Sequence, residues 1–405
     1  MSSAFIVKEH KVPGQHIREY PHALANSQND VLYLAVKEYI PKDNQNPQPG
    51  DVTILGAHAN GFPKELYEPL WEDLHRESKN FGFRIRSIII CDAAWQGQSS
   101  ILNASKLGND PGWLDYSRDI NQVINHLRPP MPIVGISHSF GGAALTNLAY
   151  SNPRLLTSLI LLDPAPQQSP AAHSFRRRDV WPSREDAAKS FAKSPFYQTW
   201  DPRVLQAWVN HGLTDIAPGK SKEVTLTTTK HQEVFTFLRP TWTAFDPSGE
   251  KLVDRTKAPE LDIEKNFPVY PFYRPEPSLT LSRVPSIRPS VLYVLGGKSN
   301  LSHPPSLSNR LRTTGAGVGG SGGVLYGRVR QVILPEQGHL VPMENPGDCA
   351  RLGAEWISQE ITRWKEGEAK EFEEWKAKSL KEKTVLDEEW GTRLGVPPRK
   401  PKAKI

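Results

Sequence analysis

Ser139 lies in the stretch 132–150, PIVGISHSFGGAALTNLAY, where its surroundings suit a nucleophile. A catalytic serine on a sharp strand-to-helix turn needs small residues two positions before and after it, because the helix passes close to the strand. Ser137 and Gly141 meet that need, although the first position usually holds glycine. The pattern predicts a nucleophile at Ser139, with an ordinary turn serine as the alternative.

His339 is the matching candidate for a general base. It lies in VILPEQGHLVPMENP, 332–346, in the loop after the last predicted strand. A histidine in that loop reaches the serine hydroxyl from the carboxyl edge of the sheet, and Gly338 permits a close approach. The alternative is a buried histidine that caps the turn.

An oxyanion hole in this arrangement uses two backbone N–H groups. One belongs to Phe140, directly after the candidate nucleophile. The other comes from a loop after an early strand, and the stretch 56–71, GAHANGFPKELYEPLW, supplies such a loop. There Gly61 lets the backbone turn inward, so that the N–H of Phe62 faces the serine. His58 in the same loop is expected to be a structural hydrogen-bonding residue.

Apolar runs predict the strands that position these residues, at 31–40, 51–59, 83–92, 131–139, 156–163, 290–297 and 330–335. Several of the runs are unbroken, as is typical of strands buried on both faces. Helical patterns lie between or after them, at 66–79, 113–127, 142–151 and 348–364. Strands that alternate with helices predict an α/β fold with a mostly parallel, doubly wound sheet.

The alternation stops between 164 and 284, a segment rich in aromatic residues. An insertion of this size between two core strands predicts a cap over the carboxyl edge of the sheet. The glycine-rich stretch 313–327 lacks the Gly-Lys-Ser/Thr ending of a phosphate loop and is expected to be a surface loop. We therefore expect four regions: a first core segment at 1–163, the cap at 164–284, a second core segment at 285–365, and a charged helical extension with a tail at 366–405.

Composition narrows the possible partners. The 405 residues carry a formal charge of +6, but no basic and aromatic residues interleave as in a nucleic-acid motif, so no nucleic-acid partner is expected. The two cysteines, Cys91 and Cys349, cannot form a disulfide framework and favour a reducing compartment. The sequence contains no uncharged run of about 18 apolar residues, so no transmembrane segment is expected.

The tripeptide Ala403-Lys404-Ile405 has the small, basic, aliphatic form of the peroxisomal import signal. It predicts the peroxisomal import receptor as a partner and the peroxisome as the location, with the cytoplasm as the alternative. The sequence leaves the oligomeric state open.

Four motifs together resemble the α/β-hydrolase superfamily: LGAHANGFP, the D-x-x-x-Q-G-Q-S run at 92–99, GISHSFGG and EQGHLVPMENP. The resemblance covers 31–163 and 290–364. Within the superfamily, HANGFPKELYEP, the cap and the tail are similar to fungal AKT2-type hydrolases of toxin-biosynthesis clusters and to the yeast peroxisomal lipase. The resemblance implies an α/β-hydrolase fold with an inserted cap, and a serine hydrolase that needs no metal or organic cofactor.

The acid of the expected catalytic triad departs from the family pattern. Family members usually place an aspartate in the loop after the strand that follows the cap, where VLGGKSNLSHP carries Ser299 and Asn300. Neither of them stabilises an imidazolium by charge. The other known placement is the end of the preceding strand, where LILLDPAP provides Asp163. We expect Asp163 to be the orienting acid. Its alternative role is to cap the start of the inserted segment.

These residues predict hydrolysis of an ester or thioester through an acyl-enzyme on Ser139, with His339 as the base. The aromatic cap indicates an apolar acyl substrate, such as a lipid or a secondary metabolite. A serine at the turn argues against an epoxide hydrolase or a haloalkane dehalogenase, which need a carboxylate there. Acyl transfer by the same residues, and a non-catalytic ligand-binding protein on this fold, remain as alternatives.

Overall fold

The computed structural model describes residues 4–164, 171–261, 268–301 and 306–396. The chain divides into two compact units, Met1–Glu360 and Ile361–Ile405. All candidate catalytic residues belong to the first unit. The predicted import tripeptide, Ala403-Lys404-Ile405, lies outside the described residues.

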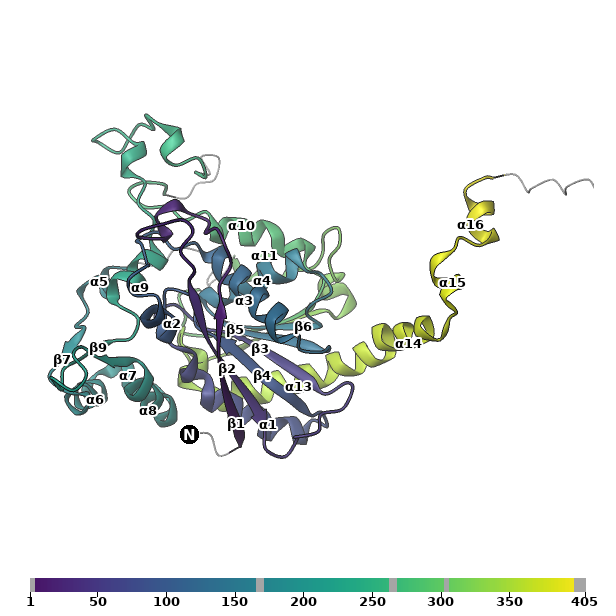
Figure 1. The fold of residues 1–405 in the computed structure, drawn as a ribbon, viewed down its shortest axis with the longest axis horizontal. Helices are drawn as coiled ribbons and strands as arrows, with labels where there is room; N and C mark the ends of the chain where they lie inside the picture. The colour runs from purple at the N-terminus through teal and green to yellow at the C-terminus, as the bar shows by residue number, and fades with distance from the viewer. Residues whose placement is uncertain (1–3, 165–170, 262–267, 302–305, 397–405) are drawn as a thin grey trace, which may run out of the picture. The chain divides into compact units, whose positions relative to one another are not determined.

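An eight-stranded sheet forms the centre of the first unit, in the order β1-β2-β4-β3-β5-β6-β10-β11 (Figure 1). Its strands are β1 (Phe5–Pro13), β2 (Tyr33–Pro41), β3 (Val52–Ala57), β4 (Ile85–Cys91), β5 (Ile133–His138), β6 (Ser158–Leu162), β10 (Ser290–Gly296) and β11 (Val329–Leu334). The pairs from β4 to β11 are parallel, whereas β2 is antiparallel to both of its neighbours. Every residue of β3, β5, β6 and β10 is buried, which explains the unbroken apolar runs. The predicted fold class is confirmed.

The strand β1 is the one element of this sheet that the sequence analysis missed. Its sequence, FIVKEHKVP, exposes most of its side chains and buries Phe5 and Val12 near its ends. Such a strand has neither an apolar run nor a clear alternation, because its stability comes from backbone pairing with β2 along nine residues.

Helices cover both faces of the sheet. The helices α3 (Trp113–Leu127) and α4 (Phe140–Ser151) lie on one face, and α1 (Glu68–Asn80) and the N-terminal portion of α13 (Pro346–Trp364) lie on the other (Figure 1). The predicted helices match these four within a few residues. The further helices of the core are α2 (Gly97–Leu102), α11 (Ser306–Thr313) and α12 (Val341–Glu344), and α10 (Glu276–Arg283), at the end of the segment between β6 and β10, packs against α4. Both cysteines are buried as free thiols.

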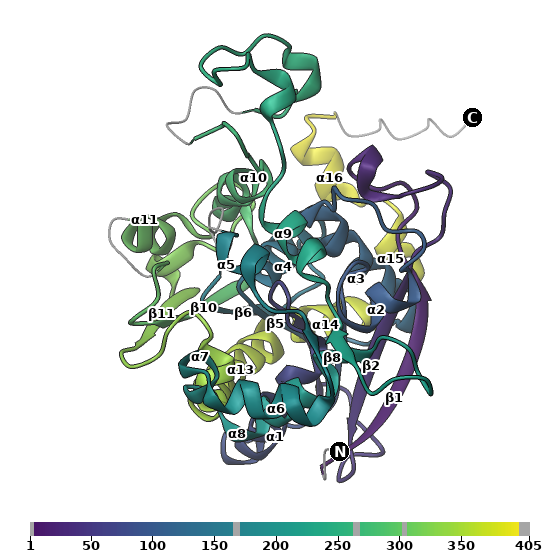
Figure 2. The same ribbon diagram turned by 90° about the vertical axis from the view of Figure 1, so that its left-hand side faces the viewer.

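The cap segment, defined here as 164–284, connects β6 to β10. It contains α5 (Ala172–Arg176), α6 (Arg184–Lys193), α7 (Pro195–Gln198), α8 (Pro202–His211), α9 (Lys230–Phe237) and a three-stranded sheet of β7 (Val180–Trp181), β9 (Val224–Leu226) and β8 (Leu213–Asp215). The helices α6, α7 and α8 gather beside one another (Figure 2). Most of the aromatic side chains that mark this segment pack against each other, as Phe191 does on Trp181 and Trp208, so they form its internal core.

The second unit is helical. It continues α13 through a π-helical turn at Lys365–Ala369 into α14 (Lys370–Ala377), followed by α15 (Leu380–Thr384) and α16 (Glu388–Arg393). In the described parts of the chain, none of the helices is both long enough and apolar enough to span a membrane.

Candidate active site

Ser139 occupies the turn between β5 and α4. Its backbone has φ 52° and ψ −119°, a conformation that residues other than glycine rarely adopt. Gly141 lies so close to the loop after β3 that a Cβ on it would come within 2.5 Å of the Ala57 carbonyl oxygen. Ser137, at the first small position of the turn, is buried in β5.

The structure brings Ser139, His339 and Asp163 together. The distance from His339 Nε2 to Ser139 Oγ is 2.8 Å, and the distance from His339 Nδ1 to Asp163 Oδ2 is 2.6 Å. The serine precedes α4, the aspartate follows β6, and the histidine lies in the loop after β11. Because β5, β6 and β10 are parallel neighbours and β11 follows them, all three residues meet at the carboxyl edge of the sheet.

Asp163 is buried, and its environment favours the carboxylate. Burial by itself would raise the pKa of Asp163, but hydrogen bonds from His339, Ser299 and the Gly296 N–H, together with the charge of His339, hold it below its ordinary value. The Ser299 hydroxyl donates to Oδ2 at 2.5 Å and the Gly296 N–H donates to Oδ1 at 3.2 Å. A carboxylate held in this way is suited to orient the imidazole.

The two predicted oxyanion donors differ in their surroundings. Phe140 is the first residue of α4, and the positive end of the helix dipole lies at its N–H. The N–H of Phe62 donates to the Ala59 carbonyl at 3.3 Å, so it must leave this long hydrogen bond to serve an oxyanion. Gly61 has φ 84°, as its expected role in turning the loop requires.

Buried polar groups, two of them from the D-x-x-x-Q-G-Q-S run at 92–99, hold the loop around Phe62. The side-chain Oε1 of Gln96 accepts from the Gly61 N–H at 2.8 Å. Asp92 accepts from the Lys64 N–H at 2.9 Å and from Lys64 Nζ at 2.7 Å. His58 Nε2 accepts from the Ala93 N–H at 2.9 Å, in line with its expected structural role.

Another chain of hydrogen bonds joins this loop to the loop of His339. The Ala59 N–H donates to the Tyr67 hydroxyl at 2.8 Å, and that hydroxyl lies 3.0 Å from His138 Nδ1. His138 Nε2 lies 2.9 Å from the carbonyl oxygen of His339. A carbonyl only accepts, so Nε2 carries the proton and Nδ1 accepts from Tyr67. Sequence reasoning placed His138 in the turn motif without a role.

Glu233 of α9 brings the cap segment onto the loop around Phe62. Its backbone carbonyl accepts from Asn60 Nδ2 at 3.0 Å, and a Cβ on Gly61 would come within 3.1 Å of its carboxyl carbon. Its carboxylate is held by Ser174 Oγ at 2.6 Å and by Arg177 Nη1 at 2.7 Å. The rings of Trp200 and Trp208 pack edge-on against Phe62.

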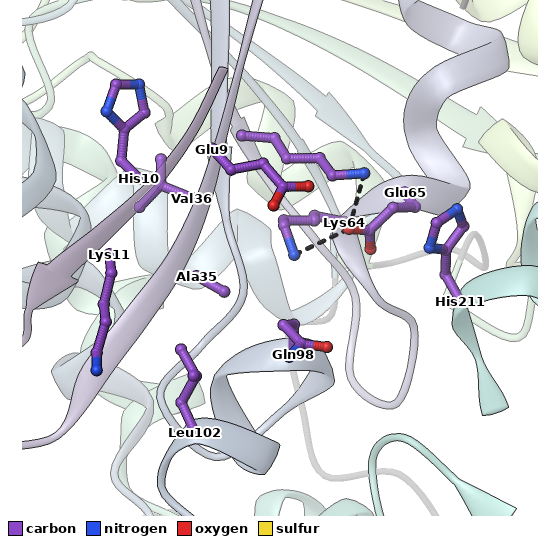
Figure 3. A pocket seen from close by; sticks show the side chains of 11 residues that line it. Glu9, His10, Lys11, Ala35, Val36, Lys64, Glu65, Gln98, Leu102 and His211 are labelled. Atoms are coloured by element: carbon purple, nitrogen blue, oxygen red, sulfur yellow. Dashed lines mark ion pairs between the residues drawn. The ribbon is translucent and has the colours of Figure 1, made fainter. Parts of the chain in front are cut away.

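A polar cavity of about 510 Å³ lies between the core and the end of α8. Lys37 and Lys64 both pair with Glu65 there, and His211 faces the group from the cap segment (Figure 3). Neither Ser139 nor His339 lines this cavity.

Known proteins share this fold and much of this sequence. A family model described as the alpha/beta hydrolase family matches residues 54–352. The chain therefore belongs to the alpha/beta hydrolase family, and it is an enzyme of the hydrolase class.

Its relatives include fungal proteins. It is 38% identical to the "Type I acyl-CoA thioesterase mpaH" of Penicillium roqueforti over 96% of this chain and 95% of that protein. The "Abhydrolase domain-containing protein AKT2" of Alternaria alternata is 31% identical over 56% of this chain and 84% of its own length. Among solved structures, the "Peroxisomal alpha-beta-hydrolase Lpx1" of Saccharomyces cerevisiae superposes with a TM-score of 0.67 at 16% identity, over 89% of this chain and 90% of that one. The resemblance stated from the sequence is confirmed.

Proposed function

We propose that this chain is a serine hydrolase that cleaves a thioester of an apolar acyl group through an acyl-enzyme on Ser139. The observation that supports this most directly is the hydrogen-bonded series Ser139, His339 and Asp163. Thioesters are favoured over oxygen esters because full-length relatives at 38% and 39% identity are called acyl-CoA thioesterases.

The proposed reaction begins with attack of Ser139 Oγ on the acyl carbonyl. His339 Nε2 takes the hydroxyl proton, while Asp163 stabilises the imidazolium through Nδ1. The tetrahedral oxyanion accepts from the N–H groups of Phe140 and Phe62. The imidazolium then returns its proton to the leaving thiolate, and an acyl-enzyme remains.

Water completes the cycle in the same geometry. His339 takes a proton from the water that attacks the acyl-enzyme. As the second tetrahedral species collapses to the free acid, the imidazolium returns this proton to Ser139 Oγ. The rings of Trp200 and Trp208 pack against Phe62, whose N–H is one of the two proposed oxyanion donors. Apolar rings at this place support the proposal that the acyl group is apolar.

The experiment that tests this proposal combines a fluorophosphonate probe with hydrolysis assays. We expect the probe to label the wild type, to leave Ser139→Ala unlabelled and to react slowly with Asp163→Asn. Medium-chain acyl-CoA thioesters, followed by release of free thiol, should be cleaved faster than oxygen esters of the same acids. An unlabelled wild type contradicts the proposal and favours a binding protein, whereas acyl products on an added alcohol at the expense of free acid favour acyl transfer.

Peroxisomal location also belongs to the proposal and rests on the sequence Ala403-Lys404-Ile405. A fluorescent protein fused in front of this chain should reach peroxisomes, and deletion of the tripeptide should leave it in the cytoplasm. A fusion that stays cytoplasmic with the tripeptide present contradicts the proposed location alone.

A further inference from the structure

Gln96 contacts both central residues of the turn that ends at Phe62. The hydrogen bond from the Phe62 N–H to the Ala59 carbonyl, at 3.3 Å, closes this turn, and Asn60 and Gly61 lie between them. Gln96 Oε1 accepts from the Gly61 N–H at 2.8 Å, and Gln96 Nε2 donates to Asn60 Oδ1 at 2.6 Å. One side chain from outside the turn therefore holds the backbone of Gly61 and the side chain of Asn60.

The proposed reaction needs this support. When the Phe62 N–H donates to an oxyanion it leaves the Ala59 carbonyl, so the turn loses the hydrogen bond that closes it. A turn of four residues has one such backbone bond across it, and Gly61 holds a φ of 84° that most residues avoid. The two hydrogen bonds to Gln96 do not involve the Phe62 N–H, so they persist while this group serves the oxyanion.

The Gln96 amide is itself held by α9 of the cap segment. Its Nε2 also donates to Thr236 Oγ1 at 3.1 Å, and Trp95 Nε1 donates to the same oxygen at 2.8 Å. The Thr236 hydroxyl spends its own proton on the Gln232 carbonyl, at 2.7 Å, so its oxygen is free to accept and the orientation of the Gln96 amide is fixed. Because Gln96 and Thr236 are completely buried, water does not replace a lost partner at either residue.

We infer that Gln96 is a positioning residue for the Phe62 N–H, and that Thr236 of the cap segment acts on this oxyanion donor through Gln96. The inference rests on the proposed function. Asn60 adds a second connection between the turn and α9, because its Nδ2 donates to the Glu233 carbonyl at 3.0 Å. One hydrogen-bond network thus sets both the contact of α9 with the core and the place of an oxyanion donor. The cap segment therefore contributes to stabilisation of the transition state.

The first arm of the test removes the Gln96 amide. Gln96→Met keeps a long unbranched side chain but loses the amide that serves the turn. Since removal of one oxyanion donor costs about 10²–10³-fold in rate, we expect fluorophosphonate labelling of Ser139 to slow by at least about tenfold. The affinity for a trifluoromethyl ketone, which binds the serine as a tetrahedral oxyanion, should fall in step with that rate, while the KM for an acyl-CoA thioester stays close to that of wild type. A merely structural loss would not weaken the ketone selectively.

The second arm acts from the cap segment. Thr236→Val removes the hydroxyl and keeps a similar shape, so labelling should slow several-fold, whereas Thr236→Ser keeps the hydroxyl and should be labelled at a rate close to that of wild type. Thr228→Val is the matched control, because the buried Thr228 Oγ1 accepts from the Gly97 N–H at 2.8 Å and so joins the same two segments by a bond that bypasses the turn. This variant should lose stability without a change in labelling rate.

The outcomes separate the inference from the proposed function. A wild type that is not labelled overturns the proposed function and this inference with it. If wild type is labelled and folded Gln96→Met is labelled at a similar rate, or if its KM rises while its affinity for the ketone is unchanged, only the inference is overturned. If Gln96→Met does not fold, the threonine variants decide, and equal labelling of Thr236→Val and Thr228→Val overturns the inference.

Discussion

His138 Nε2 donates a hydrogen bond to the backbone carbonyl of His339, at 2.9 Å. The residue directly before the candidate nucleophile therefore holds the loop that carries the candidate base. Burial, followed by the charge of His339, lowers the pKa of His138 to about 3, so this ring stays neutral at all pH values at which the enzyme is expected to work.

The neutral ring predicts a loss of stability in acid. Between about pH 6.5 and pH 3 the unfolded chain protonates His138 and the folded chain does not, so stability rises with pH and is lost as pH falls. This single group contributes at most about 1.4 kcal/mol per pH unit. Urea unfolding at a series of pH values should show a shallower decline for His138→Gln than for wild type. His126→Gln, at an exposed site on α3, is the control, and equal slopes for His138→Gln and wild type would contradict the prediction.

Gly61→Ala should reduce activity more than stability. Gly61 and Gly82 both have positive φ, 84° and 73°, so alanine strains the backbone by about 1–2 kcal/mol at either site. Only at Gly61 does the new Cβ press on the Glu233 carboxyl, because nothing lies within 4 Å of a Cβ on Gly82. We expect a loss of more than tenfold in labelling rate for Gly61→Ala and near wild-type rates for Gly82→Ala. Equal rates in the two variants would show that Glu233 does not restrain this loop.

The pair of Glu233 and Arg177 should be strongly coupled. Glu233 is buried. Its Oε2 lies 2.7 Å from Arg177 Nη1, and its Oε1 accepts from the Ser174 hydroxyl. A double-mutant cycle with Arg177→Ala and Glu233→Gln should give a coupling free energy of about 1–3 kcal/mol by chemical denaturation.

The control for this cycle lies in the same cap segment. Arg184 Nη2 lies 3.4 Å from Asp215 Oδ1, and both side chains are more exposed than those of Arg177 and Glu233. Their double-mutant cycle should therefore give a coupling free energy close to zero. Coupling of the same size in both cycles would contradict a special role for Glu233.

The buried pair of Lys64 and Asp92 should stabilise the folded chain. Asp92→Ala leaves the Lys64 ammonium buried with Glu65 as its remaining partner, and we expect a loss of about 3–5 kcal/mol in the free energy of unfolding. Lys298 and Glu336 form a pair of the same length, 2.7 Å, on the surface, and Lys298→Ala should have no measurable effect. Similar unfolding curves for the two variants would contradict this prediction.

Much of the candidate site follows from local sequence. The turn around Ser139 needs a strand, small residues and a helix in succession, and all of them are encoded within about 20 residues. His339 and Asp163 each follow an apolar run that ends at the same edge of a parallel sheet, so the sequence places them together once the strand order of the family is assumed.

The bonds around these residues come from segments far apart in the chain. Ser299 was set aside as uncharged, yet it lies 2.5 Å from Asp163, 136 positions earlier in the sequence. The hydrogen bond from Asn60 Nδ2 to the Glu233 backbone carbonyl likewise joins the cap segment to the core. No local pattern encodes such a meeting, because it depends on how two separately folded segments pack.

Local sequence patterns suffice to predict the fold class, the strands of the parallel sheet and the residue types available for chemistry, because burial on both faces and the turn at Ser139 impose such patterns. The groups that hold Asp163, His339 and the loop of Phe62 in place become evident in the folded chain alone. Hydrogen bonds between buried side chains are short-ranged and directional, and they exist only when β6, β10, β11 and the cap segment have packed.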